Sequence, residues 1–450
     1  RLKIFGGENI PEIGPVLLVG SHYSFIDWAV LQMASPRPLK MASNRNKSNA
    51  WYQRWLRYSK FLIQIDRRNP EPAMQAIREA LMQGEAVVIF PEGEVSKTPH
   101  ISRFSIDYSS AIKDTESKIL PFYIQGLFGG PYSHAEDSIM FGPASTRIVS
   151  VGFGSLIPAQ SSEENIRIQL RDLAIDTWET AISYYHTIVP MWLRVMRRRK
   201  FKTILIDPKN GRHVSAYKMI RLVLLLSRRL SRITQQESNL GFLLPSSREG
   251  VLGFLSILSL GKTSVNLNYT SPADVVMGCI KNAKVKTVVT SENFYEKLCQ
   301  KNPNFSELKE KVKFFFIDKE ENDISKVTHF VVSLFTILSP KFLIEFCFSA
   351  TKKLSDTAVI LFSSGSEGVP KGIMLSHKNL IANTQQIDSV VRLKNNDVML
   401  AELPMFHSFG VTGNILLSLL DGIPMVLCPD PTDIKTMARA CAEYKATILF

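Results

Sequence analysis

The sequence predicts an α/β fold in two domains, and three observations support this prediction. Apolar runs rich in β-branched residues, typical of buried strands, occur at residues 15–20, 86–90, 119–124 and 148–152. Stretches with a helical spacing of apolar residues lie between them, as in residues 72–83. The chain has 450 residues, about three times the length of a typical domain, so we expect more than one hydrophobic core.

The second half of the chain repeats the alternation of strands and helices. Residues 167–188 predict a helix that closes the first domain, and residues 203–214 contain two short extended runs around an Asp-Pro-Lys-Asn-Gly turn. Ser215 is then expected to cap a helix that ends at residue 233. Further strands are expected at residues 241–245, 263–267, 287–290, 314–317, 357–362, 398–403, 424–427 and 446–450.

These elements predict a first domain over residues 1–193, a basic linker over 194–202 and a second domain over 203–450. Because the last expected strand reaches residue 450 without a cap or a closing helix, we expect the second domain to be incomplete. The absence of an initiator methionine leaves room for a preceding segment.

The composition excludes several classes of protein. Hydrophobic residues at 45%, charged residues at 21% and a mean hydropathy of +0.02 are not those of a disordered or collagen-like chain. No apolar run reaches the roughly 20 residues of a membrane span, and the nearest, residues 330–350, is interrupted by Pro340, Lys341 and Glu345. Any membrane contact is therefore expected to be peripheral. Five cysteines without a Cys-x-x-Cys pair argue against a disulfide scaffold or a zinc site.

The net charge of +13 is concentrated in one segment. Residues 194–232 contain thirteen Lys or Arg against the single acid Asp207, and few aromatic residues stand between the arginines, which argues against a nucleic-acid-binding surface. Two interpretations of the helix over 215–233 remain open. Its basic and apolar residues suit an anionic membrane surface, or the apolar residues pack into the second domain while the arginines face water.

The first set of chemical residues follows the strand at 15–20. His22 and Asp27 are spaced so that, at a turn from strand to helix, the carboxylate can hold one ring nitrogen and leave the other to take a proton from an attacking hydroxyl. Phe-Pro-Glu-Gly, with Glu92 and Gly93, ends the strand at 86–90, where α/β proteins commonly build sites. Upstream, an arginine pair that includes Arg67 suits a phosphate.

In this order the motifs resemble those of the glycerolipid (lysophospholipid) acyltransferase family over about residues 1 to 190. The resemblance implies that His22 is the general base and that Asp27 orients it. It also implies that Arg67, Glu92 and Gly93 handle the glycerol phosphate of the acceptor. This half of the chain then needs no cofactor.

The second set follows the strand expected at 357–362. The loop after this strand contains small hydroxyl residues and glycines, which let backbone N–H groups surround phosphate oxygens, and a lysine that adds positive charge to the site. The predicted phosphate-binding residues are Ser363, Ser364, Gly365, Ser366, Glu367, Gly368 and Lys371. The loop resembles the phosphate-binding signature of adenylate-forming acyl ligases. Residues 403–410 resemble a second motif of that family, whose histidine and aromatic residues, here His407 and Phe406, line the acyl and adenylate pocket. We expect both motifs to lie on one sheet.

This resemblance covers about residues 203 to 450 and implies that ATP and Mg²⁺ activate a fatty acid, which a thiol of acyl carrier protein or coenzyme A then accepts. Some family features are absent. The metal-binding Glu motif, the ribose-binding Asp and the C-terminal domain with its catalytic Lys have no counterpart here, so no metal ligand is predicted. Where many acyltransferases have Thr-Arg-Ser, residues 94–96 read Glu-Val-Ser.

The two halves together resemble one bifunctional family, 2-acylglycerophosphoethanolamine acyltransferase fused to acyl-[acyl carrier protein] synthetase. The resemblance implies that a lysophospholipid is converted to phosphatidylethanolamine at the cytoplasmic face of the bacterial inner membrane. Two alternatives remain. The chain is a glycerol-3-phosphate or lysophosphatidate acyltransferase joined to an acyl-CoA ligase, or a membrane-associated scaffold with decayed sites. Acyl chain length, headgroup and oligomeric state stay open.

Overall fold

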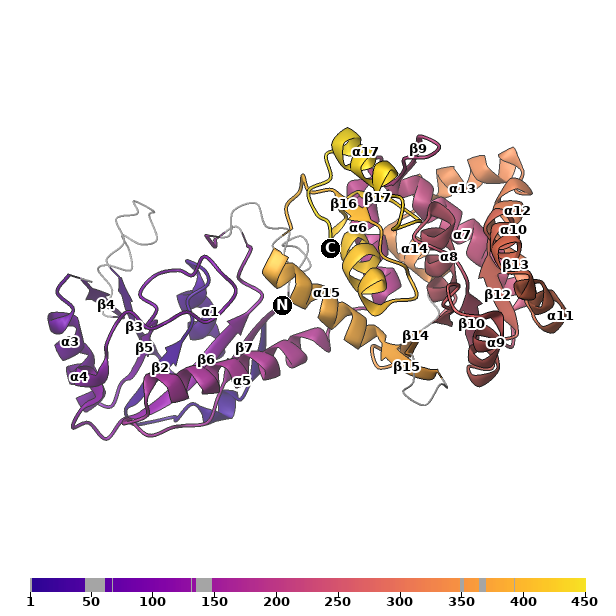
Figure 1. The fold of residues 1–450 in the computed structure, drawn as a ribbon. Coiled ribbons are helices and arrows are strands. Elements are labelled where there is room, and N and C mark those ends of the chain that lie inside the picture. The colour runs from indigo at the N-terminus through magenta and orange to yellow at the C-terminus, as the bar shows by residue number, and fades with distance from the viewer. Residues whose placement is uncertain are drawn as a thin grey trace. The chain divides into compact units, whose positions relative to one another are not determined.

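A computed structural model describes residues 2–44, 61–66, 68–130, 132–134, 148–348, 352–363, 370–391 and 393–450 of the chain (Figure 1). The chain divides into two compact units, Arg1–Tyr185 and His186–Phe450. Both units are α/β, as the sequence predicts.

The first unit is built on a seven-stranded sheet in the order β1-β7-β6-β2-β5-β3-β4. All neighbours are parallel except β6 and β7. The strands are β1 (Leu2–Phe5), β2 (Val16–Gly20), β3 (Leu39–Asn44), β4 (Leu62–Ile65), β5 (Ala86–Ile89), β6 (Lys118–Gln125) and β7 (Val149–Phe153).

Helices cover both faces of this sheet, which explains why its central strands are continuous apolar runs. Leu17 and Val19 of β2 pack with α3 (Glu71–Met82) and α5 (Glu163–Ile182), whereas Leu18 packs on the other face with α1 (Asp27–Ala34). A short helix, α4 (Ser109–Ile112), packs against α3. The central strands β2 and β5 are neighbours, so the turns that follow them meet at one edge of the sheet.

The second unit contains two sheets. A six-stranded sheet has the order β13-β12-β10-β11-β14-β15, and a four-stranded sheet has the order β16-β17-β8-β9. Only β14–β15 and β8–β9 are antiparallel. The strands are β8 (Thr203–Asp207), β9 (Arg212–Ser215), β10 (Asn239–Phe242), β11 (Thr263–Asn266), β12 (Thr287–Thr290), β13 (Lys313–Phe316), β14 (Thr357–Ser363), β15 (Lys371–Ser376), β16 (Met399–Ala401) and β17 (Met425–Leu427).

The helices of this unit surround the two sheets. They are α6 (Ile188–Arg199), α7 (Ala216–Ile233), α8 (Arg248–Ser259), α9 (Ala273–Asn282), α10 (Glu292–Lys301), α11 (Leu308–Lys311), α12 (Ile317–Asn322), α13 (Lys326–Leu338), α14 (Lys341–Phe348), α15 (His377–Val391), α16 (Leu417–Asp421) and α17 (Ile434–Tyr444). The predicted cap of α7 is confirmed, because the Ser215 hydroxyl accepts the N–H of Lys218 at 3.4 Å. Within the described ranges no helix is long and apolar enough to cross a membrane.

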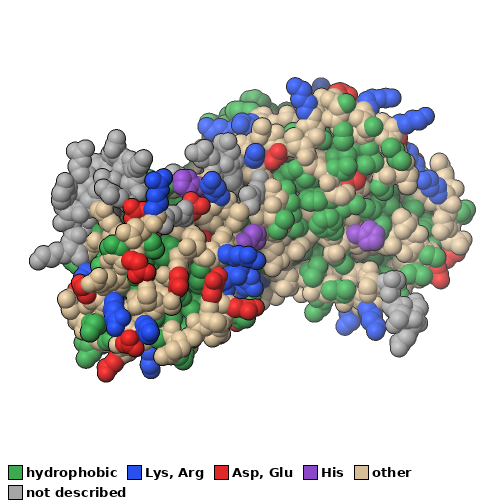
Figure 2. Space-filling view, turned by 60° about the vertical axis from the view of Figure 1, so that its left-hand side comes forward, with side chains coloured by type: hydrophobic (Ala, Val, Ile, Leu, Met, Phe, Trp, Pro, Cys, Tyr) green, Lys and Arg blue, Asp and Glu red, His purple; other side chains and the backbone are tan. Residues whose placement is uncertain are grey.

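The basic segment is part of the second unit. Residues 194–202, predicted as a linker, contain the last six residues of α6, and on this helix Trp192 and Met196 are fully buried. In α7 the apolar residues 222–226 are buried as well. This favours the interpretation in which the helix packs into the domain core. In the view of Figure 2, acidic and basic side chains mix on the first unit, whereas hydrophobic side chains form a broad area on the second.

One expected element ends in the wrong place and another is absent. The predicted helix at 167–188 is confirmed over residues 167–182, which belong to α5, but α5 ends at Ile182 and a separate helix, α6, starts at Ile188. The two helices belong to different units. The predicted strand at 446–450 is absent from the described structure there, where Ile448 makes only an isolated bridge to Met399. An apolar β-branched run is therefore not sufficient for a strand when few neighbouring backbone groups pair with it.

Candidate active sites

His22 lies in the turn between β2 and α1 and contacts Asp27, the first residue of α1. The His22 Nδ1 and Asp27 Oδ2 atoms are 2.8 Å apart, and Asp27 is completely buried. The same carboxylate oxygen accepts the backbone N–H groups of Tyr23 at 2.7 Å and Ser24 at 3.0 Å. Asp27 therefore holds the turn in shape and fixes the imidazole, as the sequence predicted for this pair.

The ring of His22 is held on a second side by Phe90. The two rings stack with their centroids 4.3 Å apart, and 14% of the His22 side chain is exposed. Because Nδ1 faces the carboxylate, Nε2 is the ring nitrogen left to accept a proton from a hydroxyl. A buried carboxylate beside Nδ1 would stabilise the imidazolium that this transfer creates. The geometry is that of a general base with its orienting group.

The Phe-Pro-Glu-Gly turn follows β5, next to the His22 turn. Gly93 has φ +81°, a left-handed conformation that favours glycine, and its N–H donates to the Phe90 carbonyl at 2.9 Å. The Ser105 hydroxyl donates to the Glu92 carbonyl at 2.7 Å, and the Ser96 N–H donates to the His22 carbonyl at 2.6 Å. The turn and the loop after it are therefore tied to the histidine.

The Glu92 side chain is 6% exposed, and its carboxylate accepts the Ser102 N–H at 3.4 Å. Burial raises the pKa of Glu92, and this rise is opposed by hydrogen bonds from Ser21 and Ser102 and by electrostatic interactions with His22 and Arg167. Sequence reasoning missed Ser21 and Arg167. No local motif marks Arg167, because it reaches the site from α5, far along the chain.

The predicted phosphate loop connects β14 and β15. These strands form an antiparallel hairpin in which Ser363 is paired with Lys371, and both residues are exposed. A hydroxyl and an ammonium group at the ends of paired strands fit an anionic phosphate. The other predicted loop residues, Ser364, Gly365, Ser366, Glu367 and Gly368, lie outside the described residues, as does Arg67.

Phe406 and His407 lie in the loop after β16, in the four-stranded sheet, so the expectation that both ligase motifs share one sheet is wrong. The loop is nevertheless tied to the other sheet. Asn266, at the end of β11, donates to the Met405 carbonyl at 2.5 Å. Phe406 is buried against Tyr269 with ring centroids 4.8 Å apart, whereas His407 is exposed.

A cavity of about 1270 Å³ lies in the second unit, at the carboxyl ends of parallel strands from both sheets. The loops that follow β8, β10, β11, β12 and β17 line it. Its lining includes Lys209, Lys297 and Lys301 together with Tyr269, whose pKa is raised by burial. The lining also includes Pro404 of the 403–410 motif. Sequence reasoning missed the cavity itself, because its other residues are spread over many loops and helices without a shared motif.

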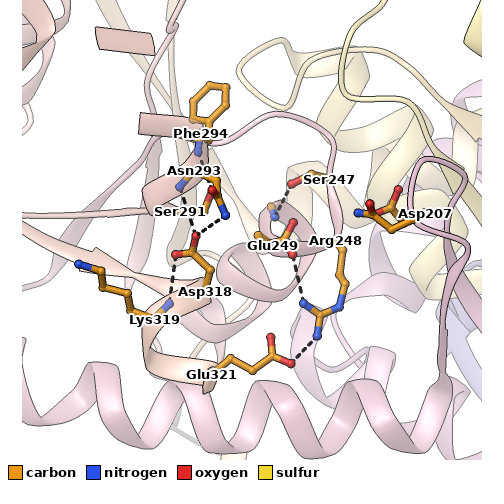
Figure 3. Close-up of polar contacts among 12 residues, drawn as sticks. Asp207, Ser247, Arg248, Glu249, Ser291, Asn293, Phe294, Asp318, Lys319 and Glu321 are labelled. Carbon is orange, nitrogen blue, oxygen red and sulfur yellow. Dashed lines mark hydrogen bonds and ion pairs between the residues drawn. The ribbon is translucent and has the colours of Figure 1, made fainter. Parts of the chain in front are cut away.

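Arginine and carboxylate side chains fix the wall of this cavity (Figure 3). Arg248 donates to Glu321 at 2.5 Å and to Glu249 at 3.1 Å. Burial alone would lower the pKa of Arg248, but the hydrogen bonds and charges of the two glutamates raise it. The carboxylate of Asp318 accepts the N–H of Glu292 at 2.9 Å, which ties α12 to the start of α10. Across the described ranges, no group of three or more His, Cys, Asp or Glu side chains is placed to hold a metal ion.

Comparison with protein families assigns both units. The family described as AMP-binding enzyme matches residues 193–450, which is more than half of the chain. The chain belongs to the AMP-binding enzyme family. The family described as Acyltransferase matches residues 1–125, which contain His22, Asp27 and Glu92. The chain is therefore an acyltransferase domain fused to an AMP-binding domain, and the fold class expected from the sequence is confirmed apart from the completeness of the second domain.

The AMP-binding domain resembles CoA ligases among curated proteins. It is similar to the probable 4-coumarate–CoA ligase 3 of Dictyostelium discoideum, 38% identical over 97 residues, 21% of this chain and 17% of that protein. It is also similar to 4-coumarate–CoA ligase 4 of Arabidopsis thaliana, 28% identical over 217 residues, 46% of this chain and 36% of that protein. The chain thus spans less than half the length of these relatives.

Solved structures similar to the AMP-binding domain include o-succinylbenzoate CoA synthetase of Bacillus subtilis, with a TM-score of 0.46 and 16% identity over 57% of this chain and 60% of that one. The N-terminal domain of FACL13 from Mycobacterium tuberculosis has a TM-score of 0.48 and 16% identity, over 58% of this chain and 62% of that one.

Proposed function

We propose that this chain belongs to an enzyme that activates a fatty acid with ATP and transfers the acyl group to a lysophospholipid. The acceptor would be 2-acylglycerophosphoethanolamine and the product phosphatidylethanolamine, made at the cytoplasmic face of a bacterial inner membrane. The observation that carries the proposal is the His22–Asp27 contact in an acyltransferase domain that shares its chain with an AMP-binding domain. One domain would make the acyl thioester that the other consumes.

In the transfer step, the free hydroxyl of the lysophospholipid attacks the carbonyl carbon of an acyl thioester. His22 Nε2 takes the proton of the hydroxyl as the new ester C–O bond forms. The C–S bond then breaks, and the departing sulfur takes the proton from His22, which returns to its starting state. Asp27 stabilises the positive imidazole between these events. Arg67, Glu92 and Gly93 would bind the acceptor's phosphate and glycerol.

In the activation step, a fatty acid carboxylate oxygen would attack the α-phosphorus of ATP, which would form an acyl-adenylate and release pyrophosphate. A thiol would then attack the acyl carbon, form the thioester and release AMP, while Mg²⁺ would offset the phosphate charge. Lys371 and Ser363 would bind the phosphates of ATP at the end of the β14–β15 hairpin, together with the loop between the strands. Phe406 and His407 would line the pocket for the acyl group and the adenylate. The contact between Phe406 and Tyr269 gives this pocket an apolar wall.

The thiol acceptor has two candidates. Acyl carrier protein follows from the resemblance of the whole chain to the bifunctional family. Coenzyme A is favoured by a different observation, because the curated relatives of the AMP-binding domain are named as CoA ligases. In the second case the enzyme would join a glycerol-3-phosphate or lysophosphatidate acyltransferase to an acyl-CoA ligase. Lys209, Lys297 and Lys301 around the cavity could attract the phosphates of either carrier.

Ready-made acyl donors test the transfer half without activation. The 450-residue chain would be given palmitoyl-[acyl carrier protein] or palmitoyl-CoA with lysophosphatidylethanolamine, lysophosphatidate or glycerol-3-phosphate. We expect most product from the first donor and the first acceptor. His22→Ala should abolish this transfer, whereas His100→Ala, at an exposed histidine of the same domain, should not. No acylated lipid from any pair would refute the proposal and favour a scaffold with decayed sites.

A further inference from the structure

Two helices of the AMP-binding domain, α13 and α14, carry a continuous apolar face that is exposed in the part of the chain that the structure describes. Their inner face rests on α7 and α6, with Val332, Thr336 and Ile344 buried. Their outer face is exposed by 39 to 80% per residue and consists of aliphatic and phenylalanine side chains: Val327, Phe330, Val331, Leu334, Ile337, Leu338, Phe342, Leu343 and Phe346. We call these nine residues the apolar face.

The spacing of the apolar face is helical. Residues 327, 330, 331, 334 and 338 of α13 follow one side of a helix, and residues 342, 343 and 346 continue the pattern on α14 after the Ser-Pro turn. Exposed apolar areas of this extent mark interaction surfaces in soluble domains.

Arginines of α6 and α7 contact the α13–α14 hairpin beside the apolar face. Arg197 donates to the Ser339 carbonyl at 3.1 Å, and Arg221 donates to the Ser333 hydroxyl at 2.7 Å. Glu345 is the sole acidic residue between Lys326 and Phe348, and it pairs with Arg194 at 3.3 Å. The hairpin of α13 and α14 is therefore apolar outward and bordered by the arginines of α6 and α7.

We propose that the α13–α14 hairpin docks on an anionic lipid bilayer and lies in its interfacial plane. Amphipathic helices with Phe and Leu on one side and basic residues nearby bind such surfaces, and anionic lipids attract the basic residues. Helices of 13 and 8 residues are too short to span a bilayer. The inference rests on the proposed function, because a phospholipid product gives the enzyme a reason to bind a membrane.

Charge and size both favour a bilayer over a protein partner. Two copies joined through their apolar faces would bring like-charged arginines of α6 and α7 together, and within the hairpin itself Glu345, already paired with Arg194, is the one acid that offsets them. A stable protein interface uses about 20 to 30 residues a side, whereas the apolar face has nine. Insertion into the surface of a bilayer needs no complementary shape, so a small apolar face is sufficient.

Flotation with lipid vesicles tests the inference. The purified 450-residue chain should bind to vesicles of phosphatidylcholine with 30 mol% phosphatidylglycerol. Its affinity should be lower for vesicles of phosphatidylcholine alone and should fall at high salt. Phe330→Ser with Phe346→Ser should lower the affinity by at least about tenfold. The matched control is Val390→Ser with Ile434→Ser, two equally exposed apolar residues on α15 and α17, which should bind as the parent chain does.

A second measurement reports depth directly. The Phe346→Trp variant should gain a tryptophan fluorescence component. Its emission should shift to the blue when vesicles are added and be quenched by brominated lipids. Equal vesicle affinity of parent and Phe330/Phe346 double variant, or no quenching, would overturn the inference. So would a dimer that the double variant dissociates while vesicle affinity stays unchanged. Vesicle binding needs no turnover, so the two proposals can fail separately. Acyl transfer to lysolipid in detergent, without vesicle binding, would refute the docking alone. Vesicle binding without any acyl transfer would refute the proposed function alone.

Discussion

Replacement of Asp27 by asparagine separates its chemical contribution from its structural one. The carboxylate accepts three hydrogen bonds on one oxygen, two of them from buried backbone N–H groups. Asparagine can still accept these two, but it offers a neutral partner to the imidazole. Charge-assisted hydrogen bonds exceed neutral ones by about 1 to 2 kcal/mol, so Asp27→Asn should slow acyl transfer by roughly 10- to 100-fold including lost orientation.

Asp27→Ala should in addition destabilise the fold. It leaves the N–H groups of Tyr23 and Ser24 without their acceptor, at about 1–3 kcal/mol for each buried donor. His22→Ala should cost about 10²- to 10⁴-fold in transfer rate, the usual range for a general base. Since Asp27 acts through His22, the double variant His22→Ala/Asp27→Asn should be no slower than His22→Ala.

The assay is the initial rate of transfer from a ready-made acyl thioester to lysophosphatidylethanolamine, with the midpoint of thermal unfolding measured for each variant. Folded Asp27→Asn protein with the parental rate would refute the assignment of Asp27 as the positioning residue. Multiplied losses in the double variant would refute its action through His22.

Three further predictions follow from charges and burial. Burial raises the pKa of Glu92 in the folded state, so the folded protein loses stability as pH rises and this carboxyl group ionises. Glu92→Gln should therefore unfold at a higher temperature than the parent at pH 7, and the two unfolding temperatures should converge below pH 4.5. The variant should still lose transfer activity. Burial lowers the pKa of His377 to about 4, so the second unit should lose stability as pH falls from 6.5 toward 4, and an equal acid sensitivity in His377→Asn would contradict this. Lys371→Ala should weaken ATP binding in equilibrium dialysis and leave transfer from ready-made thioesters unchanged, and unchanged ATP binding would exclude Lys371 from the phosphate site.

Much of the fold could be predicted from local pattern. Strands buried on both faces, such as β2 and β5, leave an apolar run that needs no tertiary information to recognise. Ser215 likewise marks the start of α7, because serine is a common N-cap residue whose side chain accepts a backbone N–H of the first turn. In contrast, the amphipathic stretch at 167–188 continues past the end of α5 at Ile182 to the first residue of α6, Ile188, although the two helices belong to different units.

The candidate sites divide in the same way. His22 and Asp27 were predictable because five residues across one turn bring them together. Arg167 and the cavity lysines were not, because they meet their partners through tertiary packing of distant loops and helices. Within the apolar run at 330–350, the described residues belong to α13, α14 and the Ser-Pro turn between them. Which residues of the run face outward depends on where α6 and α7 lie, and the local pattern does not contain that information.

The most direct test of the account is a coupled assay in the full-length protein. Labelled fatty acid, ATP, Mg²⁺, acyl carrier protein and lysophosphatidylethanolamine would be supplied together, and both labelled thioester and labelled lipid would be measured. We predict labelled phosphatidylethanolamine in the parent, labelled thioester without lipid in His22→Ala, and much less of both in Lys371→Ala. Labelled thioester with no labelled phospholipid in the parent would contradict the claim that the two domains act in sequence.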